Sequence, residues 1–340
     1  MTRSCYLAIE VAYHGEVMST LSIQLFGKFC VRRNEQILDG FDARKVQELF
    51  CYLLLHRDHS LPRETLASLL WPDTTTILSK KNLRQALWQL QSALGSQTGS
   101  ADDRVLLVEP EWIHLNPEAD FWLDVAILEN AFQLVQKVVG HELDTQKVML
   151  LQGAVQLYQG PLLEGWYQDW CLLERERLQG IYLALLDRLM SYCEAHRDYE
   201  TSLLYGMRII CYDRARERTH RCMMRMYYFI GDRAEALRQY ERCAAALEEE
   251  LGVSPSKSTL ALYRQIQADQ LNEPEPVVAF PETDPALKVV TPPLLEILSN
   301  LTHLQETMAD LQNQVQRSIQ QVELALNAAG GSPAQRKTLR

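Results

Sequence analysis

Helical periodicity over the middle of the chain is the feature that most restricts its fold. From Phe121 to about Gln270, apolar residues recur at i, i+3 and i+4 spacing almost without interruption. Only Gly160-Pro161 and the segment Leu251–Pro255 break this pattern. Helices of this kind must bury their apolar stripes against one another. The pattern therefore predicts a mainly α protein with a helical domain over residues 121–271.

Within this region, two predicted helices begin alike. Asp198 precedes one helix and Asp232 another, 34 residues later, and Leu203 and Leu237 correspond under the same shift. Thirty-four residues is the period of the tetratricopeptide helix–turn–helix repeat. The spacing favours a tetratricopeptide-like array, and the alternative is an unrelated helical bundle in which one spacing coincides.

The first part of the chain combines strands with helices. Leu21 to Gly27 alternates apolar and polar residues, as a half-buried strand does. The remaining elements are predicted, in chain order, as a strand at 36–38, helices that begin after Asp42, at Pro62 and after Thr76, and a hairpin of strands at 104–108 and 112–115. We expect this α+β unit to cover residues 18–120, after a leader, 1–17, without fixed structure.

The C-terminal part has two distinct patterns. Six prolines between Asn272 and Pro293 predict an extended linker. Over residues 294–326, apolar residues then recur every seven positions, which predicts a coiled-coil helix. The alternative is a single amphipathic helix that packs back onto the body of the protein. Residues 327–340 are expected to be a disordered tail.

Charge bears on nucleic-acid binding. Thirty-four Lys and Arg face forty-four Asp and Glu, and the net charge is −10. Such a chain cannot bind DNA as a general polycation, so that any DNA contact must come from a local patch. Residues 18–125 hold eleven basic and fourteen acidic side chains, a net charge of −3.

Cysteines and apolar runs indicate the compartment. The eight cysteines form no C-x-x-C pair, and no run of 18 apolar residues is present. The first seventeen residues lack the apolar core of a signal peptide. We therefore expect a reduced, cytoplasmic protein that does not enter a membrane.

Motifs for catalysis are absent from the sequence. There is no G-x-x-x-x-G-K-[ST] loop, no G-x-G-x-x-G after a strand and no G-x-S-x-G elbow. His56 and His59 have an H-x-x-H spacing without a third ligand nearby, which favours a solvated turn over a zinc site. We expect neither an enzyme nor a cofactor nor a metal site.

The third predicted helix carries the strongest candidate for a binding surface. Its apolar stripe is Leu83, Leu87, Leu90 and Leu94. An α-helix fits the major groove of DNA, where Arg reads guanine, Gln reads adenine and Lys contacts phosphates. The opposite face presents Lys80, Lys81, Arg84, Gln85, Trp88 and Gln89, and further cations begin the other helices at Arg44, Lys45 and Arg63. The alternative is that this face is simply solvated.

Several segments resemble a known family of regulators. The segment Asn82–Leu94 resembles the recognition helix of the OmpR-type winged helix, and Arg63–Asp73 resembles the helix before it. The helical region resembles the bacterial transcriptional activator domain, through the segments Tyr158–Leu163, Glu174–Leu178, Gly231–Leu237 and Glu249–Ser256. This order of domains is similar to that of the antibiotic regulatory protein (SARP) class of activators.

This resemblance implies a sequence-specific transcriptional activator. Its winged helix would bind promoter DNA as paired protomers, a homodimer, with the hairpin at Glu109–Trp112 as the wing. The segment Asp73–Ser79 would face RNA polymerase. The wing carries Glu109 and Glu111, which departs from the pattern and predicts weak binding by one protomer. An alternative function follows: an adaptor that interacts with proteins through its helical repeats and has lost strong DNA binding.

Overall fold

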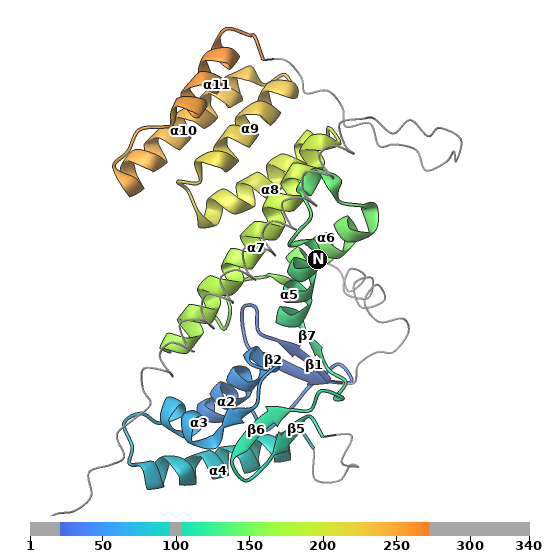
Figure 1. The fold of residues 1–340 in the computed structure, drawn as a ribbon, viewed down its shortest axis with the longest axis vertical. Helices are drawn as coiled ribbons and strands as arrows, with labels where there is room; N and C mark the ends of the chain where they lie inside the picture. The colour runs from blue at the N-terminus through green and yellow to red at the C-terminus, as the bar shows by residue number, and fades with distance from the viewer. Residues whose placement is uncertain (1–20, 96–103, 272–340) are drawn as a thin grey trace, which may run out of the picture. The chain divides into compact units, whose positions relative to one another are not determined.

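A computed structural model describes residues 21–95 and 104–271, and shows strands and helices in the N-terminal part followed by helices alone (Figure 1). The predicted fold class, a winged helix followed by a helical domain, is confirmed. The predicted leader, linker, C-terminal helix and tail lie outside the described residues.

Seven short strands form two sheets. One sheet has the order β3-β2-β1-β7, and the other has the order β4-β6-β5. In β1, Leu21 and Ile23 are buried while Ser22 and Gln24 are half-buried, as the alternating pattern predicts. The strands are β1 Leu21–Gln24, β2 Cys30–Arg33, β3 Gln36–Ile37, β4 Leu61–Pro62, β5 Leu106–Val108, β6 Trp112–Leu115 and β7 Trp122–Leu123.

Strand β7 is a feature that the sequence pattern did not reveal. Its residues Trp122 and Leu123 pair in parallel with Ser22 and Ile23 of β1, although the helical pattern in the sequence begins at Phe121. Both side chains of β7 are buried. A short apolar run buried on both faces cannot be assigned to strand or helix from periodicity alone.

Three helices pack between and beside the two sheets. They are α2 Arg44–Leu55, α3 Arg63–Leu70 and α4 Thr76–Ala93. Strand β4 directly precedes α3 and pairs with β6, so that the β5–β6 hairpin is joined to the start of that helix. As a result α4 and the hairpin lie next to each other at one end of this domain (Figure 1).

The remaining elements are helical. Helix α7 is the longest, with 27 residues, and α8 packs against it. Under the 34-residue shift, the pair α8–α9 corresponds to the pair α10–α11. These helices are α5 Asp124–Val135, the 3₁₀ helix η2 Gly140–Glu142, α6 Thr145–Leu157, α7 Asp169–Ala195, α8 Tyr199–Tyr212, α9 Glu217–Phe229, α10 Arg233–Leu251 and α11 Lys257–Gln267.

A buried carboxylate joins the first sheet to the helical domain. Asp124, the first residue of α5, accepts hydrogen bonds from the backbone amides of Leu25 and Phe26, at 2.8 and 2.9 Å, just after β1. Its other oxygen accepts from the amide of Val125 at 2.7 Å. Burial raises the pKa of Asp124 to about 7. The hydrogen bonds from the three amides favour the charged form and act in the opposite direction, but burial has the larger effect. The junction therefore depends on a polar group inside a continuous apolar core.

Candidate nucleic-acid interface

Helix α4 separates an apolar face from a polar one. The first face is buried in the domain and consists of Ser79, Leu83, Ala86, Leu87 and Leu90. The side chains predicted to contact DNA lie on the opposite face, where Lys80, Lys81, Arg84, Gln85 and Trp88 are exposed and Gln89 is half-buried. The helix thus presents cations, amides and one indole together.

Large apolar side chains are also exposed on α4. Trp88 is 61% exposed, and Ile77 and Leu78, in the first turn of the helix, are 83% and 45% exposed. Single exposed apolar residues are common, but three large ones on one helix mark a surface that another molecule can cover. The first turn and the middle of α4 therefore offer two apolar contact points.

A groove runs between α3, α4 and the turn of the β5–β6 hairpin. It has a volume of about 760 Å³, and Arg63, Lys80, Arg84 and Trp112 are among its lining residues. Arg63 ties the hairpin to α3, because its backbone amide donates to the carbonyl of Glu111 at 2.9 Å and its side chain donates to the carbonyl of Glu109 at 3.2 Å. The wing is thus held beside the polar face of α4.

Acidic side chains reduce the positive charge of this groove. The Lys80 ammonium lies 2.5 Å from a carboxylate oxygen of Glu64, and this hydrogen bond lowers the pKa of Glu64. Glu111 also lines the groove. Within the described part of the chain, no carboxylate pairs with Lys81 or Arg84 at 4.0 Å or less. A phosphate or a base can therefore engage Lys81 and Arg84 without competition from a carboxylate.

Arg44 and Lys45 lie elsewhere, against the helical domain. Both pair with the buried carboxylate of Glu48, Arg44 at 3.6 Å and Lys45 at 2.7 Å. The Arg44 guanidinium also lies 3.6 Å from the ring centroid of Trp166. Gln168 donates a further hydrogen bond to Glu48 at 2.8 Å. The structure thus does not bring these two residues together with the face of α4.

Residues 21–95 and 104–271 offer neither a group of metal ligands nor a membrane-spanning helix. No group of three His, Cys, Asp or Glu side chains in these ranges could hold a metal ion. His56 stacks on Tyr52 with 4.1 Å between ring centroids, and its ring nitrogen lies 2.9 Å from the Tyr52 carbonyl. No helix in the same ranges has the length and apolar character needed to span a membrane.

Comparison with known proteins decides the nature of the helical region. Residues 123–267 match the family described as bacterial transcriptional activator domain. The helical region is therefore similar to the domains of this family. This match begins at the last residue of β7 and ends at the last residue of α11.

A solved structure among the matches has a similar fold. It is EmbR of Mycobacterium tuberculosis, in complex with a low-affinity phosphopeptide. The TM-score is 0.58 at 17% sequence identity, over 75% of this chain and 67% of EmbR. A search of curated proteins found no match. Together, the match to the bacterial transcriptional activator domain and the EmbR-like fold confirm the predicted resemblance to the antibiotic regulatory protein class.

Sequence reasoning missed parts of the interface. It did not assign Glu64, whose ion pair with Lys80 joins two helices through residues 16 positions apart. Spacing within one helix gives no signal for such a pair. The exposed Ile77 and Leu78 do have a sequence signal, since they precede the apolar stripe of α4 rather than belong to it.

Proposed function

We propose that this protein is a sequence-specific activator of transcription that binds promoter DNA through α4 of the winged helix. The observation that carries this proposal is the exposed face of α4, which holds Lys81, Arg84, Gln85 and Trp88 beside a hairpin fixed by Arg63. Recognition helices of this kind enter the major groove and read base edges.

The roles of the side chains follow from their chemistry. Arg84 can donate two hydrogen bonds to guanine, Gln85 and Gln89 can each pair with adenine, and the Trp88 indole can contact a thymine methyl group. Lys80 and Lys81 are placed for phosphates near the start of the helix.

The remaining predicted cations have smaller parts in this proposal. Arg63 stands in the groove beside the wing and fits a phosphate contact there. Arg44 and Lys45 share Glu48 away from the face of α4, and we assign them no base contact, only phosphate contacts outside the groove.

RNA polymerase and a second protomer complete the proposal. Ile77 and Leu78 belong to the segment 73–79, and their exposure supports a protein contact there. We assign that contact to RNA polymerase, in the cytoplasm where promoter DNA is transcribed. Because the domain carries a net charge of −3, one protomer would bind weakly, and a homodimer would raise the affinity through effective concentration.

Substitution of Arg84 tests the proposal. A DNA site is first selected from random fragments with the full-length protein, and affinities are then measured by fluorescence anisotropy. We expect Arg84→Ala to weaken specific binding by about 1–3 kcal/mol. Arg264→Ala, an exposed arginine on α11, is the matched control and should bind like the wild type. Equal affinity of both variants would show that α4 does not read DNA.

A second candidate function is an adaptor that works through its helical domain. The ion pair of Lys80 with Glu64 and the acidic wing favour it, since both reduce attraction for phosphates. A gel shift at about 50 mM salt distinguishes the two functions, because even non-specific binding is strong under that condition. Failure to retard any genomic fragment would support the adaptor.

A further inference from the structure

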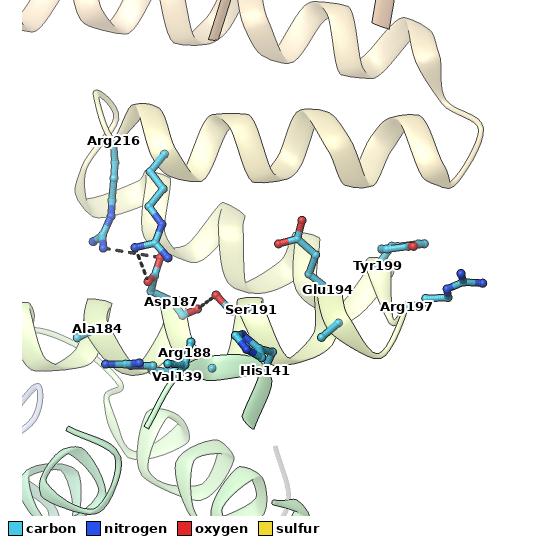
Figure 2. A pocket seen from close by; sticks show the side chains of 13 residues that line it. Val139, His141, Ala184, Asp187, Arg188, Ser191, Glu194, Arg197, Tyr199 and Arg216 are labelled. Carbon is cyan, nitrogen blue, oxygen red and sulfur yellow. Dashed lines mark hydrogen bonds and ion pairs between the residues drawn. The ribbon is translucent and has the colours of Figure 1, made fainter. Parts of the chain in front are cut away.

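The helical domain contains a hollow that the proposed DNA contacts do not use. It has a volume of about 550 Å³ and lies between the segment around η2, helix α7 and the two turns that flank α8 (Figure 2). Its size is in the usual range for sites that bind small molecules. The residues that line it are Val139, Gly140, His141, Ala184, Asp187, Arg188, Ser191, Glu194, Ala195, Arg197, Tyr199, Arg216 and Arg218.

Positive charge predominates in this hollow. Arg188, Arg197, Arg216 and Arg218 line it, against the two carboxylates of Asp187 and Glu194, so that the lining has a formal charge of 4 − 2 = +2 with His141 neutral. Glu194 is further neutralised from outside the lining, because Arg225 donates two hydrogen bonds to it, at 2.9 and 2.6 Å. An anion is therefore the favoured occupant.

Asp187 and its two arginines leave hydrogen-bonding capacity unused. Arg216 lies 3.9 Å and Arg218 lies 3.4 Å from the carboxylate oxygens, whereas charge-assisted hydrogen bonds are about 2.7–2.9 Å long. Figure 2 shows Arg216 reaching down toward Asp187 from the turn before α9. The Oδ1 atom of Asp187 is buried, but the side chain is 14% exposed, so that Oδ2 is the oxygen that a ligand in the hollow can reach. The site therefore offers donors and one acceptor side by side.

The wall formed by η2 is fixed by close packing. A Cβ atom on Gly140 would lie 2.7 Å from Cβ of Ser191 and 2.8 Å from the carbonyl oxygen of Arg188, so that only glycine allows η2 to approach α7 this closely. Arg188 also donates a hydrogen bond to the carbonyl of Val138, just before η2. The hollow is thus formed before any ligand arrives.

We infer that this hollow binds a small phosphorylated polyol, a compound of the sugar phosphate class. Its phosphate would be held by Arg216 and Arg218, which can each donate two hydrogen bonds to an oxyanion. A neighbouring hydroxyl would donate to Oδ2 of Asp187. A neutral sugar would give the two guanidinium groups no anion besides Asp187, and a bare anion would bring no alcohol hydroxyl to that carboxylate. The inference is independent of DNA binding.

Calorimetry on the full-length protein tests this site, with ribose 5-phosphate as the probe. We expect one site per chain with a dissociation constant below about 1 mM. Arg218→Gln should weaken binding by about tenfold or more. The matched control is Arg214→Gln, an arginine of similar exposure in the turn just before α9, which pairs with Glu249 outside the hollow. Absence of saturable binding, or equal loss in both variants, would overturn the proposal.

The contact with Asp187 needs a separate comparison. The ratio of affinities for ribose 5-phosphate and inorganic phosphate should fall toward one in Asp187→Ala, because only the sugar phosphate has alcohol hydroxyls that extend beyond the phosphate group to that oxygen. Thermal unfolding of the variant shows whether it is folded, and Asp187→Asn serves in its place if it is not. A ratio that stays at the wild-type value, or binding of ribose as tight as that of ribose 5-phosphate, would overturn the assignment of a phosphorylated polyol.

Discussion

Asp198 and Asp232 make the same contact 34 residues apart. The side chain of Asp198 accepts from the backbone amide of Thr201 at 3.2 Å, and that of Asp232 accepts from the amide of Glu235 at 2.9 Å. Each carboxylate thereby satisfies an amide that the first turn of its helix leaves unpaired. The two helix pairs that follow, α8–α9 and α10–α11, thus begin with the same cap, as the predicted repeat requires.

The residues just before these caps are also equivalent. Arg197 has a φ of 60° and Gly231 a φ of 94°, both in the left-handed region. The amide that follows each of them donates back into the preceding helix, to the carbonyl of Cys193 at 2.9 Å and to that of Tyr227 at 2.8 Å. The repeat therefore includes the turn that ends one helix and begins the next.

Removal of a cap should destabilise the helical domain measurably. We expect Asp232→Ala to lower the free energy of unfolding by about 1 kcal/mol, because the amide of Glu235 loses its acceptor. Asp232→Asn retains an acceptor oxygen and should cost less. Urea denaturation followed by circular dichroism measures both. Equal losses in the two variants would mean that charge, and not capping, is what Asp232 supplies.

Substitution by alanine should destabilise the protein at Gly231 but stabilise it at a glycine within a helix. Its left-handed conformation makes a Cβ unfavourable, and we expect Gly231→Ala to lower the free energy of unfolding by about 1–2 kcal/mol. Gly180 lies within α7 with open space around its missing Cβ, so that Gly180→Ala should raise stability by up to about 1 kcal/mol. The same urea titration compares the two. A gain in stability for Gly231→Ala would contradict the assigned turn.

Some of the fold could be predicted because the responsible signals are local. The apolar stripe of α4, the alternation in β1 and the capping aspartates lie within a few residues of the structures that they specify. Strand β7 could not be predicted, because its two residues are a strand only through pairing with β1, about a hundred positions earlier. Its burial on both faces leaves no periodicity to detect.

The candidate site was predictable to the extent that it belongs to one helix. The polar face of α4 follows from helical spacing, as do Lys81, Arg84 and Gln85 on it. The position of Arg44 against Trp166 does not, because the contact joins residues from two domains. A basic residue at the start of a helix thus does not indicate whether its partner is a DNA phosphate or another side chain of the protein.

The buried carboxylate of Asp124 should make stability depend on pH. Its pKa is raised to about 7 in the folded protein, whereas an unfolded aspartate titrates near 4. The folded state therefore binds more protons between these values, and this contribution to the free energy of unfolding falls as the pH rises from about 4 to about 7. His220 contributes with the opposite sign near neutral pH, because burial lowers its pKa.

Comparison with Asp124→Asn isolates this contribution. Urea denaturation of both proteins at intervals from about pH 4.5 to 8 gives the difference between their free energies of unfolding. His220 contributes equally to both proteins, so that its contribution cancels in this difference. We expect the advantage of the wild type over the variant to shrink as the pH rises. A difference that is constant over this range would show that Asp124 is ionised in the folded protein throughout.

The predicted C-terminal helix lies outside the described residues and can be tested by deletion. If the heptads at 294–326 pair two chains, removal of residues 294–340 should lower the mass in solution to that of one protomer. Light scattering measures this mass for the full and shortened chains. An unchanged mass would favour the alternative, a single amphipathic helix that packs on the body of the protein.

The ion pair between Glu64 and Lys80 gives the sharpest test of the acidic groove. Glu64 is exposed on α3 and holds Lys80 at 2.5 Å, so that Glu64→Gln should release the ammonium for a phosphate. We expect tighter DNA binding and a salt dependence steeper by about 0.9 in log–log slope, the value of one more phosphate contact. Glu118→Gln removes the same charge at an exposed position that does not line the groove, and should leave the slope unchanged. If both variants tighten binding equally with no change of slope, net charge alone controls affinity and Lys80 does not contact DNA.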